Sequence, residues 1–402
     1  ADVLVISGQA KLDSDIIHGS TSAINSLDLV AACRPGALAF LTTGSSEIGG
    51  VRIEGPLAGR LTIDRLNYFR TAYTLSVDAD AASLHTGETE LKPQGRTCQL
   101  EVAGQYNDRN DMCLLTNWRV ALGGNTLQGD GRIRSFGRWR QRWSEPLDGE
   151  LLLTQMSQMQ GSADGELSDW ESLAAFTPGA AGLWESLAID GPVSMSGSLV
   201  FRPASQLEMT LSVPSTTTLR IGEEFSKPDA SPLRITIFAD IHANDGTLSN
   251  VDATLLCGAG KIEIGSGSLR LPTADAASSS RAVFRGDVSV EPIEAFVACL
   301  VETPDTKDII AAEPTGRLNG ELAYFCVTDE APGMVDLVFD DVAMSFGGEK
   351  SNWSAELSGV LGVRRTQAQG AAPIGEVFGD GLAITARTAG GRVDKPAGTV
   401  LR

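Results

Sequence analysis

The sequence has few of the residues with which enzymes do chemistry. Only three histidines occur in 402 residues, His18, His85 and His242, and none lies in an HExxH motif or at ligand spacing from a cysteine. There is no G-x-S-x-G elbow, no phosphate-binding loop and no dinucleotide fingerprint. The acidic clusters fall in or beside predicted turns, where Asp and Asn shape the backbone. We therefore expect no enzyme activity, no catalytic residue, no metal site and no cofactor.

Paired cysteine motifs are also missing. The six cysteines are scattered without a single C-x-x-C, which excludes a zinc ribbon and a thioredoxin motif. An even count is compatible with an oxidising compartment, and six cysteines allow fifteen fully paired arrangements. Cys98 and Cys257 lie on apolar strand faces, so small buried hydrophobic side chains are the favoured interpretation for most of the six.

Positive charge is scarce. The chain has 32 basic and 51 acidic residues, a net charge of −19, which argues against nucleic-acid binding. One segment, residues 132–143, is different, because arginines alternate there with aromatic residues. It could contact anionic headgroups or an acidic partner, or it could be a solvated strand edge. The candidate contact residues are Arg132, Arg134, Arg138, Arg140, Arg142, Trp139 and Trp143.

Long apolar runs are absent as well. No run of eighteen apolar residues and no basic-then-apolar start occurs, so we predict neither a membrane-spanning helix nor a signal peptide within these residues. The chain starts inside a strand-like run. We therefore expect a piece of a longer protein whose targeting signal and anchor lie outside these residues.

Strand periodicity is what the sequence does contain. In residues 97–134, Cys98, Leu100 and Val102 alternate with polar residues, and a polar turn follows at 107–111. A second run alternates through Leu114, Thr116, Trp118, Val120 and Leu122, and a third short strand follows Gly123–Gly124. This pattern predicts an antiparallel meander with one apolar face and one polar face.

The meander pattern recurs along the chain. Similar G-x-L strands begin at Gly59, Gly197 and Gly320, with spacings of 197 − 59 = 138 and 320 − 197 = 123 residues. The prediction is three repeat units and a tail. The units are 1–150 with a short helix near 27–41, 151–287 with a broken helix near 169–187, and 288–365 with a helix near 292–312; the weakly patterned tail is 366–402.

Residues 100–133, and especially GGNTLQGDGRI at 123–133, resemble the AsmA-like family, the TamB- and YhdP-type bridge-like lipid-transfer proteins of the Gram-negative envelope. The resemblance implies a mainly β fold: a long twisted antiparallel sheet of repeated meanders, curved into an open apolar groove, with a few short capping helices. It also implies a periplasmic location and transport of phospholipid or another acyl lipid between envelope membranes. A membrane-embedded partner could bind through flanking regions outside this chain.

The apolar rows of the predicted meanders supply the candidate groove residues. They are Leu100, Val102, Trp118, Val120, Leu122, Leu233, Ile235, Ile237, Leu255, Val335, Leu337, Phe339, Met344 and Leu357. The same rows would also suit a structural or adhesive extracytoplasmic β-array, either a solenoid or serial β-sandwiches, in which protein covers the apolar faces and the core is dry. The two functions differ in what covers the apolar face.

Overall fold

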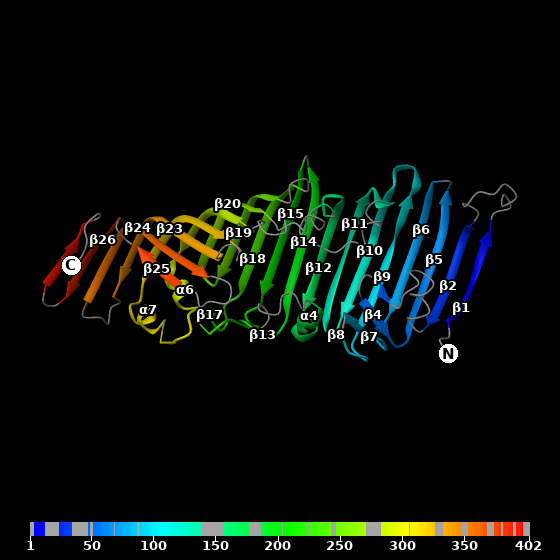
Figure 1. Ribbon diagram of the computed structural model, residues 1–402, viewed down its shortest axis with the longest axis horizontal. Coiled ribbons are helices and arrows are strands. Elements are labelled where there is room, and N and C mark those ends of the chain that lie inside the picture. Colours follow the sequence, from blue (N-terminus) through cyan, green and yellow to red (C-terminus); the bar gives the residue numbers. More distant parts are fainter. Residues whose placement is uncertain are drawn as a thin grey trace. The chain divides into compact units, whose positions relative to one another are not determined.

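The protein is mainly β, with antiparallel strands and a few short helices, as the sequence predicts. The computed structural model describes residues 4–12, 24–33, 47–48, 51–67, 69–86, 89–137, 154, 156–176, 186–202, 204–223, 225–242, 247–270, 283–304, 306–325, 333–347, 353–367, 374–378, 381–388 and 391–396. It divides into two compact units, and Figure 1 labels their strands and helices. Unit 1 comprises Ala1–Pro146, Gln158–Glu185 and Ser194–Val200, and unit 2 comprises Leu147–Ser157, Ser186–Val193 and Phe201–Arg402.

In unit 1, strands that pair in the large sheet follow one another along the chain. They are β1 (Leu4–Leu12), β2 (Ile24–Cys33), β5 (Leu57–Asn67), β6 (Arg70–Asp78), β9 (Cys98–Asn107), β10 (Met112–Leu122), β11 (Asn125–Arg134) and β12 (Met159–Leu167). A small sheet contains β3 (Glu47–Ile48), β4 (Val51–Glu54), β7 (Ser83–Thr86) and β8 (Thr89–Lys92). The described short helices include η2 (Asp108–Asn110) and α4 (Trp170–Phe176).

Unit 2 is built in the same way. Its large sheet runs through β15 (Ala204–Val213), β18 (Leu233–His242), β19 (Thr247–Cys257), β20 (Gly260–Arg270), β21 (Val283–Glu291), β22 (Thr315–Phe325), β23 (Gly333–Phe346), β24 (Trp353–Gln367), β26 (Leu382–Thr388) and β27 (Gly391–Lys395). The strand β25 (Ile374–Phe378) pairs with the C-terminal part of β24. The smaller elements are β13 (Leu187–Asp190), β16 (Thr218–Ile221), β17 (Phe225–Ser226), α6 (Ile293–Val297) and α7 (Lys307–Ala311). The boundary between the units falls within β14 (Val193–Arg202).

One structural motif occurs twice along the chain. In each copy, a short strand, a glycine with positive φ and a proline precede a long strand: Gly55 (φ +108°) lies before Pro56, and Gly191 (φ +118°) before Pro192. Each copy also has a buried lysine at the end of a small sheet. Lys92 is the last residue of β8, and Lys227 directly follows β17. The offsets are 191 − 55 = 136 and 227 − 92 = 135 residues. The three repeat units that the sequence predicts have other boundaries and stay a prediction.

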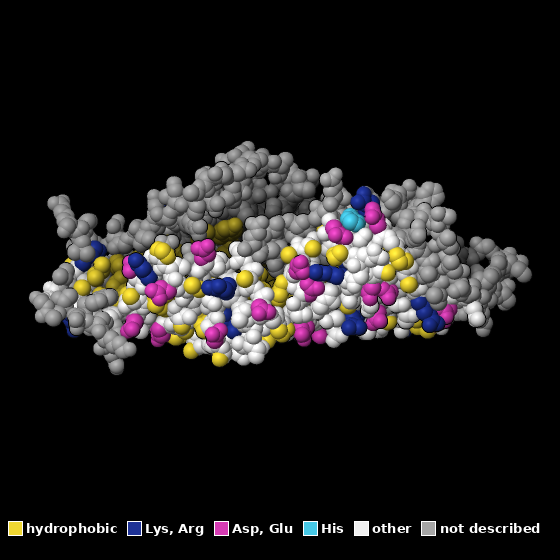
Figure 2. All heavy atoms as spheres, turned by 90° about the horizontal axis from the view of Figure 1, so that it is seen from below, with side chains coloured by type: hydrophobic (Ala, Val, Ile, Leu, Met, Phe, Trp, Pro, Cys, Tyr) yellow, Lys and Arg dark blue, Asp and Glu magenta, His cyan; other side chains and the backbone are white. Residues whose placement is uncertain are grey.

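Cross-strand register explains why the alternating pattern produces two unlike faces. Residues that lie opposite one another in a ladder point to the same side of the sheet. Val102 lies opposite both Leu75 and Trp118, so all three are on one side. The other side carries charged pairs such as Arg60 with Asp28, whose Nη2–Oδ2 distance is 2.7 Å. On the described part of the surface in view, Figure 2 shows acidic and basic side chains interspersed.

A β-bulge changes one assignment made from the sequence. Leu115 lies opposite Gly104 and Asn117 opposite Ala103, so Thr116 is an extra residue in β10. The extra residue shifts the alternation, and Leu114 therefore lies on the polar side, where it is 38% exposed. The prediction that Leu114 shares the face of Trp118 is wrong.

One predicted helix differs from the structure, and the predicted tail contains strands. The helix expected near 27–41 is wrong, because residues 24–33 form β2 and pair along their length with β1 and β5; residues 34–46 lie outside the described ranges. Leu27 and Leu29 alternate with Ser26 and Asp28, and this period of two outweighs the Ala-rich composition. The weakly patterned tail, expected to be a poorly ordered end or a truncated unit, contains β25, β26 and β27.

Helices are present in the other two segments where a helix was predicted. Within 169–187 the structure has α4, and residues 177–185, with the predicted break at Pro178–Gly179, lie outside the described part of the chain. Within 292–312 there are two helices, α6 and α7. In Figure 1 the labels α4, β4, β7 and β8 of unit 1 lie at one end of the long strands, and so do α6, α7, β13 and β17 of unit 2.

Candidate functional site

The first candidate surface is the apolar side of the unit 1 sheet, here called the first apolar face. A row crosses four strands through directly opposed residues: Leu61, Leu75, Val102 and Trp118. Strands about 4.8 Å apart make this row roughly 15 Å long. Further members on the same side are Ile63, Tyr73, Val77, Leu100, Val120, Leu122 and Leu127.

The middle of the first apolar face is incompletely covered. Leu61, Leu75, Val102 and Trp118 are all half-buried, and Val120 is 38% exposed. The inner face of a β-sandwich would instead contain side chains removed from solvent by a second sheet. The buried apolar residues of unit 1 include Cys113 and Ile133, towards one end of the strands, and Leu84 and Leu91 in the small sheet.

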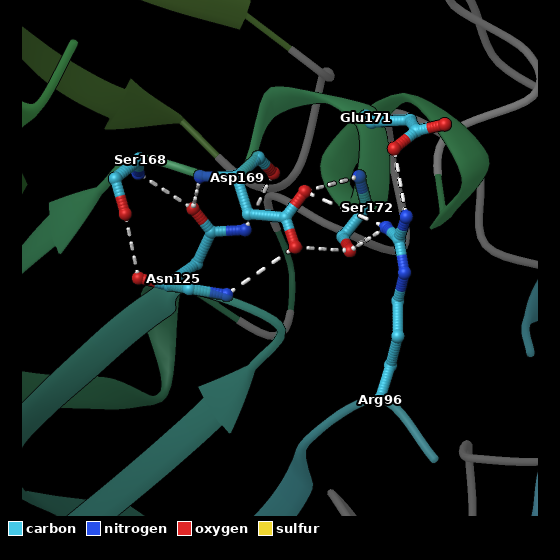
Figure 3. A network of polar contacts seen from close by, with 7 residues as sticks. Arg96, Asn125, Ser168, Asp169, Glu171 and Ser172 are labelled. Carbon is cyan, nitrogen blue, oxygen red and sulfur yellow. Dashed lines mark hydrogen bonds and ion pairs between the residues drawn. The ribbon is translucent and has the colours of Figure 1, made fainter. Parts of the chain in front are cut away.

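A polar network fixes α4 against the strand ends (Figure 3). The buried Asn125, first residue of β11, accepts hydrogen bonds at Oδ1 from the backbone N–H groups of Ser168 (2.8 Å) and Asp169 (2.9 Å) and donates from Nδ2 to the Asp169 carbonyl (2.8 Å). Asp169 in turn accepts from the N–H and hydroxyl of Ser172 at 3.0 and 2.7 Å, as an N-cap does. Arg96 completes the network with a 2.7 Å contact to Glu171.

The network also sets the ionisation of Asp169. Burial alone would raise the pKa of this carboxyl group. The hydrogen bonds from Ser172 and from the backbone N–H of Gly124, together with the charge of Arg96, outweigh burial and hold the pKa of Asp169 below its usual range. Asp169 is therefore a structural carboxylate at the start of α4.

The opposite end of the strands in unit 1 is closed by a turn. The Asp111 carboxylate accepts from the Tyr106 hydroxyl (3.1 Å) and from the Gly137 N–H (2.9 Å), and its carbonyl accepts from the Phe136 N–H (3.0 Å). The ring centroids of Phe136 and Tyr106 lie 5.8 Å apart. The first apolar face is thus bounded by polar networks at both strand ends.

The second apolar face is the corresponding side of the unit 2 sheet. One row of opposed residues runs through Ile235, Leu255, Ile262, Val290 and Leu318. The next rows contain Ile237, Ile264, Leu322, Leu337, Met344, Leu357, Leu361 and Ile384.

Part of the second apolar face is a closed core. Val288, Phe339, Val342 and Leu382 form a buried cluster on which the neighbouring aliphatic side chains pack. Leu233 is also buried, 2% exposed, at the start of β18.

All fourteen candidate groove residues lie on these two apolar faces, five in unit 1 and nine in unit 2. Within each unit the structure places its own members on one side of the sheet. Leu233 and Phe339 are enclosed by protein, and the other twelve are half-buried or exposed. The sequence pattern contained no signal that separates the enclosed members from the accessible ones.

The candidate arginine segment is only partly described. Arg132 lies on the polar side of β11 and donates from Nε (2.9 Å) and Nη2 to the Gln160 side-chain carbonyl on β12. Arg134 is exposed at the end of β11. Arg138, Arg140, Arg142, Trp139 and Trp143 lie outside the described residues.

The polar sides of the sheets also contain a hollow and two of the three histidines. A hollow on the polar side of unit 2 is lined by Arg285, Asp287, Glu321 and Asp336, and Asp336 is paired with Arg364 at 2.9 Å. Nowhere in the described ranges do three His, Cys, Asp or Glu side chains come together as a metal site would require. His85 and His242 each contact a serine hydroxyl, Ser83 at 3.0 Å and Ser249 at 2.6 Å. We take the apolar faces, and not this hollow, as the candidate site.

Among the described residues, none of the helices is long and apolar enough to cross a membrane. Comparisons with protein-family models, with curated proteins and with solved structures found no match to this chain.

Proposed function

We propose that the apolar faces bind lipid acyl chains and that the chain is a segment of an AsmA-like bridge protein, carrying phospholipid between membranes of the envelope through the periplasm. The observation that carries the proposal is the half-buried row Leu61, Leu75, Val102 and Trp118, which crosses four strands without a charged side chain. The polar side of the same strands carries the charges.

The energetics favour a lipid occupant. Each methylene removed from water contributes about 0.8 kcal/mol, so a contiguous half-exposed apolar row is stabilised by any chain of methylenes that covers it. The row contains aliphatic side chains and one indole, with no charged group that would fix a ligand at one position. An acyl chain therefore gains similar contacts at each step along the row, which permits movement.

A dry structural array is the second candidate function. The buried cluster of Val288, Phe339, Val342 and Leu382 favours it, because these side chains obtain their cover from protein. Such a core needs no ligand. The two candidates predict different contents for the purified protein.

The test is lipid content combined with a charge placed on one side of one strand. Leu75 and Ser76 are neighbours in β6 and point to opposite sides of the sheet. We expect lipid to co-purify with the wild type, as detected by native mass spectrometry and by extraction. Leu75→Lys should reduce the bound lipid severalfold, because an isolated charge among acyl chains is unfavourable.

Ser76→Lys is the matched control, with the same new charge on the exposed polar side; it should retain lipid. The melting temperature of each variant separates loss of binding from loss of fold. Wild-type protein free of lipid, together with unfolding of Leu75→Lys, would support the dry array.

A further inference from the structure

Two thiols of unit 2 lie in direct contact although the sequence separates them by 42 residues. Cys257 is the last residue of β19, and Cys299 follows α6. Their Sγ atoms are 3.3 Å apart, and each residue is only 1% exposed. The contact is therefore between two buried sulfur atoms.

The pair joins two layers of unit 2. Cys257 belongs to the large sheet. The carbonyl of Cys299 accepts from the Ser226 N–H of β17 at 2.7 Å, and the next residue, Leu300, forms a β-bridge with Phe225. Cys299 is therefore attached to the small sheet β13–β16–β17.

The helix α6 fits closely against the large sheet beside this pair. A β-carbon placed on Gly260, the first residue of β20, would lie 2.7 Å from the Ala295 Cβ. The Cys299 N–H donates to the Phe296 carbonyl at 2.9 Å, and its thiol donates to the Ala295 carbonyl at 3.4 Å. The position of Cys299 is thus fixed by backbone contacts on both sides.

Catalytic and metal-binding roles do not fit these thiols. Burial, and then the hydrogen bond with Cys257, raise the pKa of the Cys299 thiol, so the sulfur is protonated at neutral pH and a poor nucleophile. No third ligand is grouped with them in the described part of the chain. The chemistry open to two adjacent thiols is their oxidation to a disulfide.

We propose that Cys257 and Cys299 form an intramolecular disulfide when the chain folds in the presence of a disulfide donor. One thiol, as its thiolate, attacks the donor disulfide and releases one donor thiol. The second attacks the resulting mixed disulfide and releases the other. The pair loses two electrons and two protons, and the donor becomes two thiols. Bonding brings the sulfur atoms from 3.3 Å to about 2.05 Å.

The bond links the large sheet to the layer that contains α6 and the small sheet. It forms during folding, because glutathione-sized donors do not reach residues with 1% exposure in the folded state. Formation of this disulfide does not depend on lipid binding, so a negative result for one proposal does not affect the other.

The experiment is oxidative refolding of the full chain. Reduced, denatured protein is refolded in a buffer of reduced and oxidised glutathione, alkylated under denaturing conditions and digested without reduction. We expect the main disulfide product to be a peptide pair joining Cys257 to Cys299, lighter than the two reduced peptides by two hydrogen atoms. Cys98 and Cys113 lie at opposite ends of the paired strands β9 and β10, and neither should be linked to the other.

Thermal melting supplies a second readout. Reducing agent present throughout refolding should lower the melting temperature of the wild type by on the order of 5 °C relative to the form refolded with the glutathione couple. It should leave the double variant Cys257→Ala/Cys299→Ala unchanged. Glutathione adducts on both cysteines, or a main product that links either one to another cysteine, would overturn the proposal.

Discussion

Gly129 lies directly opposite Trp118 in the β10–β11 ladder, and the indole occupies the space that a side chain at 129 would need. A β-carbon there would lie 2.9 Å from the Trp118 Cζ2 and 2.0 Å from the Ser162 carbonyl oxygen. Gly129→Ala should destabilise the protein by about 1–3 kcal/mol, because a backbone oxygen and an indole must both move. The midpoint of denaturant unfolding measures this change.

Gly265 provides the control for that variant. It is a strand glycine whose added β-carbon would meet only the Asp252 carboxylate oxygen, at 3.5 Å. Gly265→Ala should change stability by less than about 0.5 kcal/mol or increase it. Equal effects of the two substitutions would contradict the importance of the Trp118 contact.

Replacement of the buried Lys92 should also lower the stability of the protein. The Lys92 ammonium donates to the carbonyls of Ala79 (2.9 Å), Asp80 (3.0 Å) and Ala82. Lys92→Met leaves these carbonyls without their donor and should cost about 2–3 kcal/mol. Lys261→Met removes an exposed lysine paired with Glu263 and should cost less than about 1 kcal/mol. Comparable losses would show that the carbonyl contacts of Lys92 contribute little.

The lowered pKa of Asp169 predicts how the stability of the protein changes at acid pH. Its pKa is lower in the folded chain than in the unfolded chain, so it contributes stability above the unfolded value of about 3.9. That contribution is lost as the pH falls from there through the folded pKa. Asp169→Asn should flatten this part of the curve, measured as the denaturation midpoint from pH 6 to about 2.5. Glu171→Gln, which removes an exposed carboxylate that also contacts Arg96, should cost less than about 1 kcal/mol at neutral pH.

Tyr73 predicts a spectroscopic signature at high pH. Its hydroxyl lies 2.9 Å from the Cys113 sulfur, and burial, followed by this contact, raises the pKa of Tyr73 far above its usual value. In the folded protein this phenol should remain protonated when ordinary tyrosines ionise near pH 10. The ultraviolet tyrosinate signal at about pH 11 should therefore be the same for the wild type and for Tyr73→Phe. A smaller signal in Tyr73→Phe would show that Tyr73 titrates normally.

Alternation in the sequence predicted the class of the fold and the membership of the apolar faces. Trp118, Ile235 and Leu337 each lie on the expected side of their strand, because a period of two specifies which side a residue occupies once the strand pairs. The pattern failed at Leu114, where a bulge that no local residue signals shifts the phase. At 27–33 the alternation matches the strand β2, and the Ala-rich composition was the misleading signal.

The degree of enclosure could not be read from the sequence. Phe339 and Leu337 have the same polarity and lie two residues apart on one face, yet only Phe339 is buried. The difference is that Phe339 belongs to a buried cluster with Val288 of β21 and Leu382 of β26. Both of these residues are distant from Phe339 in the sequence. The contact between the Cys257 and Cys299 thiols likewise depends on how α6 packs against the large sheet. The sequence spacing of the six cysteines therefore could not identify this pair.

From β18 through β24, each inner strand of the large sheet in unit 2 pairs with the strand before it and the strand after it in the chain. Such a sheet can change its length by whole hairpins. Loss or gain of two consecutive strands keeps the direction of the chain and the side to which each row points, whereas a single strand would reverse the direction. The modular step of this architecture is thus the hairpin, and chains of different reach can arise by duplicating or deleting hairpins without redesign of the remaining ladder.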